Sequence, residues 1–232
     1  MLSIKSRMFR PLTFVFAFVS LAPALRAAAP IPMPRTPAPF EVDSRVIISV
    51  RDQKLMLLQH GTRIATYPIS TSKFGLGDSL GRMTTPLGSL QVAQKIGDQA
   101  PVGAVFHNRR FTGEILRPNA PGRDPIVTRI IWLRGLEPQN VHAYNRCIYI
   151  HGTPEEKTIG RPASYGCIRM KSNDVAALYN QLPLGAMVQI VPDRLPSARK
   201  LRAEAAAATD SIAPLPPQPK AVLRVASSGR GT

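Results

Sequence analysis

Short apolar stretches, bounded by glycine, proline or polar turn residues, make up most of the sequence between residues 45 and 191. They are rich in β-branched and long apolar side chains, which is typical of strands. A glycine-rich segment from Thr71 to Gly88 interrupts them and predicts a long functional loop. The strands expected are Arg45–Val50, Leu55–Leu58, Arg63–Ile69, Ser89–Gln94, Ile126–Leu133, Cys147–His151 and Ala186–Val191. The sequence therefore predicts a mainly β domain.

Helical spacing is clear in one place, directly after Met170. Ser172 or Asn173 is the expected helix cap, because short polar side chains accept hydrogen bonds from the first free amides. The apolar residues at helical spacing are Val175, Leu178, Tyr179 and Leu182. A second short helix is expected at Ser197–Ala208, so the fold has one or two short helices.

The first 29 residues have the layout of a secretory signal peptide. Lys5, Arg7 and Arg10 precede an apolar run from Leu12 to Leu25, and alanines follow at positions 27–29. The run is too short for a bilayer span, which needs about 20 apolar residues. We expect cleavage, export to the periplasm or cell envelope, and no stable membrane insertion afterwards.

Composition sets the remaining boundaries. Five prolines between Pro30 and Phe40 predict a linker over residues 30–41, because proline fits neither helix interiors nor sheet ladders. The folded domain is expected over residues 42–193, with a basic, Ala- and Pro-rich tail over residues 194–232 predicted to be disordered.

The chain carries a formal net charge of +16, so its partner is expected to be acidic. Nucleic acid is disfavoured, because there is no basic helix or zinc-finger spacing and only 6% of residues are aromatic. A carboxylate-rich cell wall fits an exported basic protein better.

The chemically most informative pair is His151 and Cys167. His151 ends an expected strand, and Cys167 follows sixteen positions later, after Gly166. A free thiol ionises near pH 8.5, and we expect Arg169 and the following helix to favour the thiolate. His151 is the candidate base. Taken by spacing alone, the pair also fits a surface imidazole and a buried thiol.

Glycine at position 166 leaves space for a substrate, and the backbone amides around Tyr165, Gly166 and Cys167 are candidate donors to an oxyanion. A thiol, a base and an oxyanion site together suit acyl transfer. The chain has only two cysteines, Cys147 and Cys167. We expect Cys147 to have a packing role and not to form a disulfide with Cys167.

These residues resemble the signature of the L,D-transpeptidases with a YkuD-type catalytic domain. The matching segments are His151-Gly152-Thr153 and Ser164-Tyr165-Gly166-Cys167-Ile168-Arg169-Met170. The segments VIISVRDQKLMLLQHGTRIATYPIS, TTPLGSLQV and SNDVAALYNQLPLGAMVQI resemble the family's first hairpin, its Thr-Pro-x-Gly strand entry, and its last helix and strand. The resemblance covers about Arg45 to Pro192.

The resemblance implies a β-sandwich or barrel-like domain and a cysteine acyltransferase that acts on peptidoglycan stem peptides without cofactor or metal. Cys167 would attack the carbonyl of the third donor-stem residue, typically diaminopimelate, and expel the terminal D-alanine. An acceptor amine would then resolve the thioester to give a 3-3 crosslink, and water would give L,D-carboxypeptidase action.

The resemblance also suggests roles for the neighbouring residues. Tyr165 stands where the family usually has a second histidine, and a phenol there is a neutral hydrogen-bonding wall. Arg169 orients substrate or, alternatively, forms a salt bridge that ties down the loop. Ser164 and the Gly152 carbonyl are expected to orient the imidazole of His151.

Two rival hypotheses belong to other classes. A zinc-dependent wall peptidase would use His142, His151 and Cys167 as ligands, although no compact ligand spacing supports it. A noncatalytic wall-binding module would keep the loop only as a peptide cleft. His60, His107 and His142 are expected at the surface or at a pocket edge.

Overall fold

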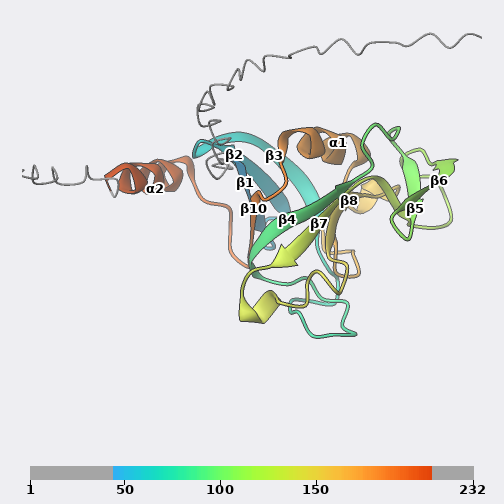
Figure 1. Cartoon of the computed structure of the whole chain (residues 1–232), viewed down its shortest axis with the longest axis horizontal. Helices are drawn as coiled ribbons and strands as arrows, with labels where there is room; N and C mark the ends of the chain where they lie inside the picture. Colours follow the sequence, from blue (N-terminus) through green and yellow to red (C-terminus); the bar gives the residue numbers. More distant parts are fainter. Residues whose placement is uncertain (1–43, 211–232) are drawn as a thin grey trace, which may run out of the picture. The chain divides into compact units, whose positions relative to one another are not determined.

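The computed structural model describes residues 44–210 (Figure 1). The expected signal peptide, the proline-rich linker and the tail beyond residue 210 lie outside the described residues. Within the described part, ten strands form one mixed sheet. They are β1 (Ser44–Ser49), β2 (Lys54–Gln59), β3 (Thr62–Ser70), β4 (Gly88–Ile96), β5 (Ala104–His107), β6 (Arg110–Ile115), β7 (Ile126–Gly135), β8 (Tyr149–Gly152), β9 (Ile168–Met170) and β10 (Met187–Val191).

Eight of these strands close on themselves. The order β4-β10-β1-β2-β3-β9-β8-β7 returns to β4 through the β4–β7 pairing. Each strand of the ring has a neighbour on both sides, although β3 pairs with β9 only at Ile69 and Ser70, while β5 and β6 form a hairpin attached to β7. Two pairs are parallel, β1 with β10 and β8 with β9. The expectation of a mainly β, barrel-like domain is confirmed.

Side-chain alternation divides each strand between two environments. In β1, Val46 and Ile48 belong to the main core enclosed by the ring. Ile47 points to the opposite face, where it packs in a small cluster with Leu201 of α2 (Ala198–Asp210). The helix expected at Ser197–Ala208 is therefore present and covers an apolar patch of the sheet.

The other helix, α1 (Ser172–Gln181), packs on β7 and β8 (Figure 1). It buries Val175, Leu178 and Tyr179 in the main core. The expected cap is wrong by one residue: the helix begins at Ser172, whose amide donates to the Glu156 carboxylate at 2.8 Å. The acceptor comes from the short 3-10 helix η2 (Glu156–Thr158), so local sequence gives no sign of it.

Three strands were not predicted, namely β5, β6 and β9. The β5–β6 turn places Asn108 and Arg109 at φ +47° and +65°, which is the geometry of a tight hairpin turn. β6 is almost entirely exposed and β9 has three residues, so neither shows an alternating pattern. Cys147 was expected within a strand; it precedes β8 and has φ +57°.

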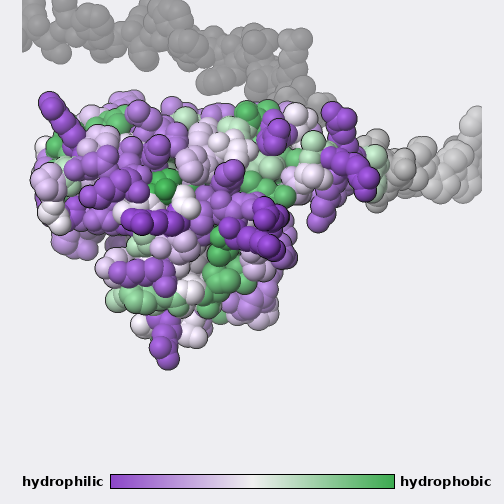
Figure 2. All heavy atoms as spheres, turned by 180° about the vertical axis from the view of Figure 1, so that it is seen from behind, coloured by the Kyte–Doolittle hydropathy of each residue, from purple (hydrophilic) through white to green (hydrophobic). Residues whose placement is uncertain are grey.

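The face of the molecule shown in Figure 2 is mostly hydrophilic, with apolar side chains in small groups. Between residues 44 and 210, neither α-helix is long and apolar enough to cross a bilayer.

Replacing Leu57 in β2 by alanine tests the ring's core. Leu57 is fully buried in the main core, so Leu57→Ala is expected to lower the free energy of unfolding by about 2–5 kcal/mol. Urea unfolding followed by circular dichroism measures this loss. The control Ile64→Ala removes a side chain of β3 that is 48% exposed and should cost about 1 kcal/mol or less. Equal losses would contradict the described core.

Candidate active site

The parallel pairing of β8 with β9 brings the predicted residues together. Ile150 pairs with Ile168 and His151 with Arg169. Both isoleucines are fully buried in the main core, so their neighbours point to the opposite face of the sheet. His151, Arg169 and Cys167 therefore share that face.

Cys167 is partly buried, and its thiol contacts backbone groups. Its Sγ donates to the Cys147 carbonyl at 3.3 Å, and the Tyr149 amide donates to the sulfur at 3.5 Å. Burial raises the pKa of the Cys167 thiol to about 11, which outweighs the opposing effect of Arg146 and Arg169. The expected thiolate is thus wrong for the resting site. In addition, β9 separates Cys167 from the start of α1, so the helix terminus is not adjacent.

The imidazole of His151 is also buried, with 6% of the residue exposed. Its Nδ1 lies 2.7 Å from the Gly152 carbonyl. A carbonyl only accepts, so Nδ1 carries the proton and Nε2 keeps a free lone pair. Burial lowers the pKa of His151 to about 4, so the ring is neutral at pH 7.

Gly152 also allows close packing beside the imidazole. A Cβ there would lie 2.6 Å from the Val127 carbonyl oxygen on neighbouring β7. A side chain at this position would therefore displace either β7 or the carbonyl that orients His151.

The two side chains are close neighbours without a direct bond. In the described part of the chain, no hydrogen bond joins Sγ of Cys167 to the His151 ring. His151 pairs with Arg169, and Cys167 lies two positions before Arg169, so the register makes the two residues diagonal neighbours. The thiol points towards Cys147, on the other side of Tyr149 from His151.

Ser164 shapes the loop that carries Cys167. It was expected to orient His151, but its hydroxyl bonds to the loop instead. Its Oγ donates to the Cys167 carbonyl at 2.6 Å and accepts the Gly166 amide at 3.2 Å. Gly166 has φ +125°, so glycine is required there by the backbone. The Gly166 amide is thus occupied in the resting structure, and the amides of Tyr165 and Cys167 are the remaining candidate oxyanion donors.

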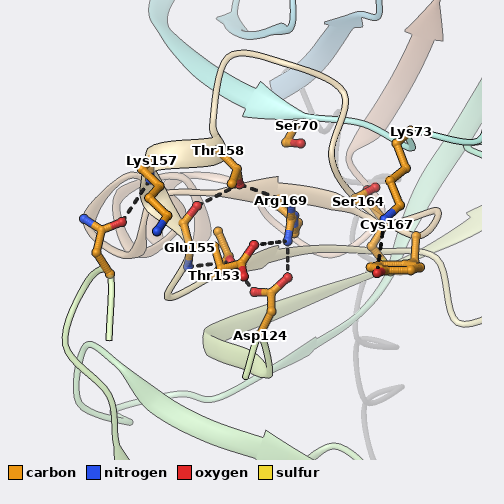
Figure 3. Close-up of polar contacts among 12 residues, drawn as sticks. Ser70, Lys73, Asp124, Thr153, Glu155, Lys157, Thr158, Ser164, Cys167 and Arg169 are labelled. Carbon is orange, nitrogen blue, oxygen red and sulfur yellow. Dashed lines mark hydrogen bonds and ion pairs between the residues drawn. The ribbon is translucent and has the colours of Figure 1, made fainter. Parts of the chain in front are cut away.

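Arg169 is buried and forms a salt bridge with Asp124 (Figure 3). A second carboxylate, from Glu155, lies 3.7 Å away, and the guanidinium donates to Thr158 at 3.2 Å. Of the two roles considered for Arg169, the structure therefore shows the salt bridge. It ties the segment between β6 and β7 to the strand that follows Cys167.

Tyr165 lies at the surface, with 59% of the residue exposed. Its hydroxyl accepts a hydrogen bond from Lys73 Nζ at 3.2 Å, and its ring packs against Phe74 with centroids 5.6 Å apart. The phenol thus forms part of an exposed wall.

Sequence reasoning missed Arg146, Asp124 and Lys73. Arg146 is buried in an ion pair with Asp78 at 2.7 Å. It also donates to three carbonyls of the glycine-rich segment, at residues 77, 82 and 84, and so holds that loop beside the nucleophile. Glycine and proline in the segment signalled a functional loop, but no local pattern identified its anchor.

Between residues 44 and 210, no three His, Cys, Asp or Glu side chains gather closely enough to hold a metal ion. The backbone amide of His142 donates to the Asp78 carboxylate at 2.6 Å. The proposed zinc ligands His142, His151 and Cys167 therefore do not form a site.

The Arg169–Asp124 salt bridge should stabilise the fold. Asp124→Asn removes one charge from a pair whose side chains are 4% and 21% exposed, so we expect a loss of about 2 kcal/mol in urea unfolding. Glu114→Gln is the matched control, because the nearby Arg123–Glu114 pair is exposed and should cost less than about 1 kcal/mol. A similar loss in both variants would argue against a structural salt bridge.

Alkylation of Cys167 should rise with pH well beyond neutrality, because only the thiolate reacts and burial holds the thiol pKa near 11. At pH 7.5 we expect a rate roughly 300-fold below that of free cysteine, from the ratio of the two thiolate fractions. The alkylation rate is measured by iodoacetamide labelling, read at each cysteine by peptide mass spectrometry. Urea-unfolded protein is the control. Fast labelling that is flat between about pH 5 and 9 would instead indicate a thiolate–imidazolium pair.

Comparison with known proteins identifies the family to which the chain belongs. The model of the YkuD family, described as the L,D-transpeptidase catalytic domain, matches residues 43–190. "Putative L,D-transpeptidase YqjB" of Bacillus subtilis is 27% identical over 155 residues, which are 67% of this chain and 75% of that protein. "Putative L,D-transpeptidase YkuD" of the same organism is 28% identical over 171 residues, covering 74% and 80%.

Among solved structures, the L,D-transpeptidase from Mycobacterium smegmatis aligns with a TM-score of 0.42 and 16% identity. The alignment covers 64% of this chain, which spans 58% of the length of that one. The family model covers well over half of the sequence and includes both His151 and Cys167. The chain belongs to the L,D-transpeptidase family with the YkuD catalytic domain.

Proposed function

We propose that the protein is an exported peptidoglycan L,D-transpeptidase whose Cys167 forms a thioester with a donor stem peptide. The observation that carries this proposal is the placement of Cys167 and His151 on one face of two paired parallel strands. A free Nε2 lone pair beside a thiol is the minimum equipment for nucleophilic acyl transfer. Family membership supports the same reaction class.

The neutral resting pair sets the order of the first steps. The thiol leaves the Cys147 carbonyl, turns towards His151 and gives its proton to Nε2 as sulfur attacks the third stem residue's carbonyl carbon. The amides of Tyr165 and Cys167 hold the oxyanion. The C–N bond to D-alanine then breaks, and the imidazolium returns its proton to the leaving amine.

The second half-reaction uses the same groups in reverse. An amine of an acceptor stem attacks the thioester carbon and gives a proton to His151. The C–S bond breaks, and that proton returns to the sulfur of Cys167. The product is a 3-3 crosslink in the cell wall. Water as the acceptor makes the enzyme an L,D-carboxypeptidase.

Two features of the sequence outside the site fit a protein of the cell envelope. The pattern of residues 1–29 supports export to the periplasm or cell envelope, and the net charge of +16 suits an acidic wall polymer. The alternative of a noncatalytic wall-binding module shares both features. The two differ only in turnover at Cys167.

Incubation with a purified stem tetrapeptide tests the proposal. Mass spectrometry should show loss of D-alanine and a Cys167 adduct in the wild type, and neither in Cys167→Ala or His151→Ala. Supplying a second stem or water alone as acceptor separates crosslinking from hydrolysis. Cys167→Ala and His151→Ala should each lower turnover at least 1,000-fold, because both groups act in one transition state.

His142→Ala serves as the matched control, since that imidazole has no part in the proposed chemistry and should leave turnover unchanged. A folded wild type with no adduct and no turnover would instead identify a noncatalytic wall-binding module.

A further inference from the structure

A pocket of about 470 Å³ lies beside the nucleophile loop. Its lining is unusually charged: it includes Lys73 and Arg161 on the loop side, and Asp124, Glu155 and Arg169 from the salt-bridge network. The exposed ring of Tyr165 completes the wall. The pocket therefore offers charges of both signs beside the loop that carries Cys167.

The acidic side of this pocket is already partnered. Asp124 pairs with Arg169, and Glu155 lies 3.7 Å from the same guanidinium. The basic side is different: within residues 44–210, no carboxylate forms an ion pair with Lys73 or Arg161. The uncompensated charge of the pocket is thus positive, which favours an anionic ligand group.

Lys73 is held in place by aromatic groups. Its Nζ donates to the Tyr165 hydroxyl at 3.2 Å and lies 4.4 Å from the centroid of the same ring. Phe74 provides a second ring at 5.2 Å. Such contacts fix an ammonium without neutralising its charge, and leave it further N–H donors for a ligand.

Backbone contacts connect Lys73 to the nucleophile. The Lys73 amide donates to the Ser164 carbonyl at 3.1 Å, and Ser164 Oγ donates to the Cys167 carbonyl at 2.6 Å. Figure 3 shows Lys73, Ser164 and Cys167 close together, with Arg169, Glu155 and Asp124 as a separate group facing them. The ammonium is therefore positioned relative to the thiol through both its backbone and its side chain.

We infer that Lys73, assisted by Arg161, binds a carboxylate of the peptide substrate in this pocket and determines specificity for the acid over the amide. Tyr165 is a positioning residue that holds the ammonium. The inference rests on the proposed function for the identity of the substrate. A stem tetrapeptide offers two such carboxylates: the one on its terminal D-alanine and the distal one on its diaminopimelate side chain.

Equilibrium binding to the full-length Cys167→Ala variant tests the inference without turnover. Three tetrapeptides are compared by calorimetry: unmodified, amidated at the terminal D-alanine, and amidated at the distal carboxylate. Adding Lys73→Gln should weaken binding of the unmodified peptide about two- to fivefold, as expected for an exposed ion pair. Lys73→Gln should leave unchanged the binding of the one peptide in which the recognised carboxylate is amidated. That result identifies the carboxylate.

Conservative variants separate charge from structure. Lys73→Arg should bind the unmodified peptide within about twofold of the parent, because the charge is kept. Tyr165→Phe removes the hydroxyl and keeps the ring, so it should give part of the loss, again only for peptides with the recognised carboxylate. Lys54→Gln, an exposed lysine on β2, is the control and should change nothing.

The inference is overturned if Lys73→Gln leaves binding of the unmodified peptide intact, or weakens all three peptides equally. Wild-type turnover with a Cys167 adduct reports separately on the proposed function. Carboxylate-dependent binding without turnover would leave the assignment of Lys73 standing and reject the enzyme. Turnover by the wild type, together with unchanged peptide binding in Lys73→Gln, would support the enzyme and reject the assignment of Lys73.

Discussion

The parallel pairing of β8 with β9 is the constraint on which the site depends. Ile150 and Ile168 are drawn into the core because burying their side chains is favourable, by roughly 1.5–3 kcal/mol each. Alternation then places His151, Cys167 and Arg169 on the opposite face. Core packing and catalytic geometry are therefore set by the same register, and a slip by one residue would turn the thiol inward.

Burial has a second consequence, which is chemical. Cys167 packs against an apolar cluster that includes Trp132 and Tyr149, and only 6% of His151 is exposed, so both groups lose part of their hydration. Desolvation disfavours charge on either, raising the pKa of the Cys167 thiol and lowering that of His151. The resting site stores its proton on sulfur, hydrogen-bonded to Cys147.

Two arginines hold the walls of the site by different means. Arg146 binds Asp78 and loop carbonyls and fixes the glycine-rich segment, while Arg169 binds Asp124 and fixes the segment before β7. Both side chains are buried and paired, so their charges are largely neutralised by structural partners. Lys73 is the contrasting case, because aromatic rings and not a carboxylate hold it. This difference separates the residues that build the pocket from one able to recognise a ligand.

The sequence alone determined the mainly β class, most strands and α1, and it predicted the pair His151 and Cys167 as the candidate site, because each has a local signature: apolar alternation, helical spacing, or a thiol in a glycine loop. Tertiary structure decided the closed ring, the strands β5, β6 and β9, and the carboxylate at the start of α1. It also decided that Arg169 is paired, that Ser164 contacts Cys167 and not the imidazole, and that the resting thiol is neutral. These properties depend on burial and on partners distant in sequence, such as Asp124 and Lys73, which no local pattern encodes.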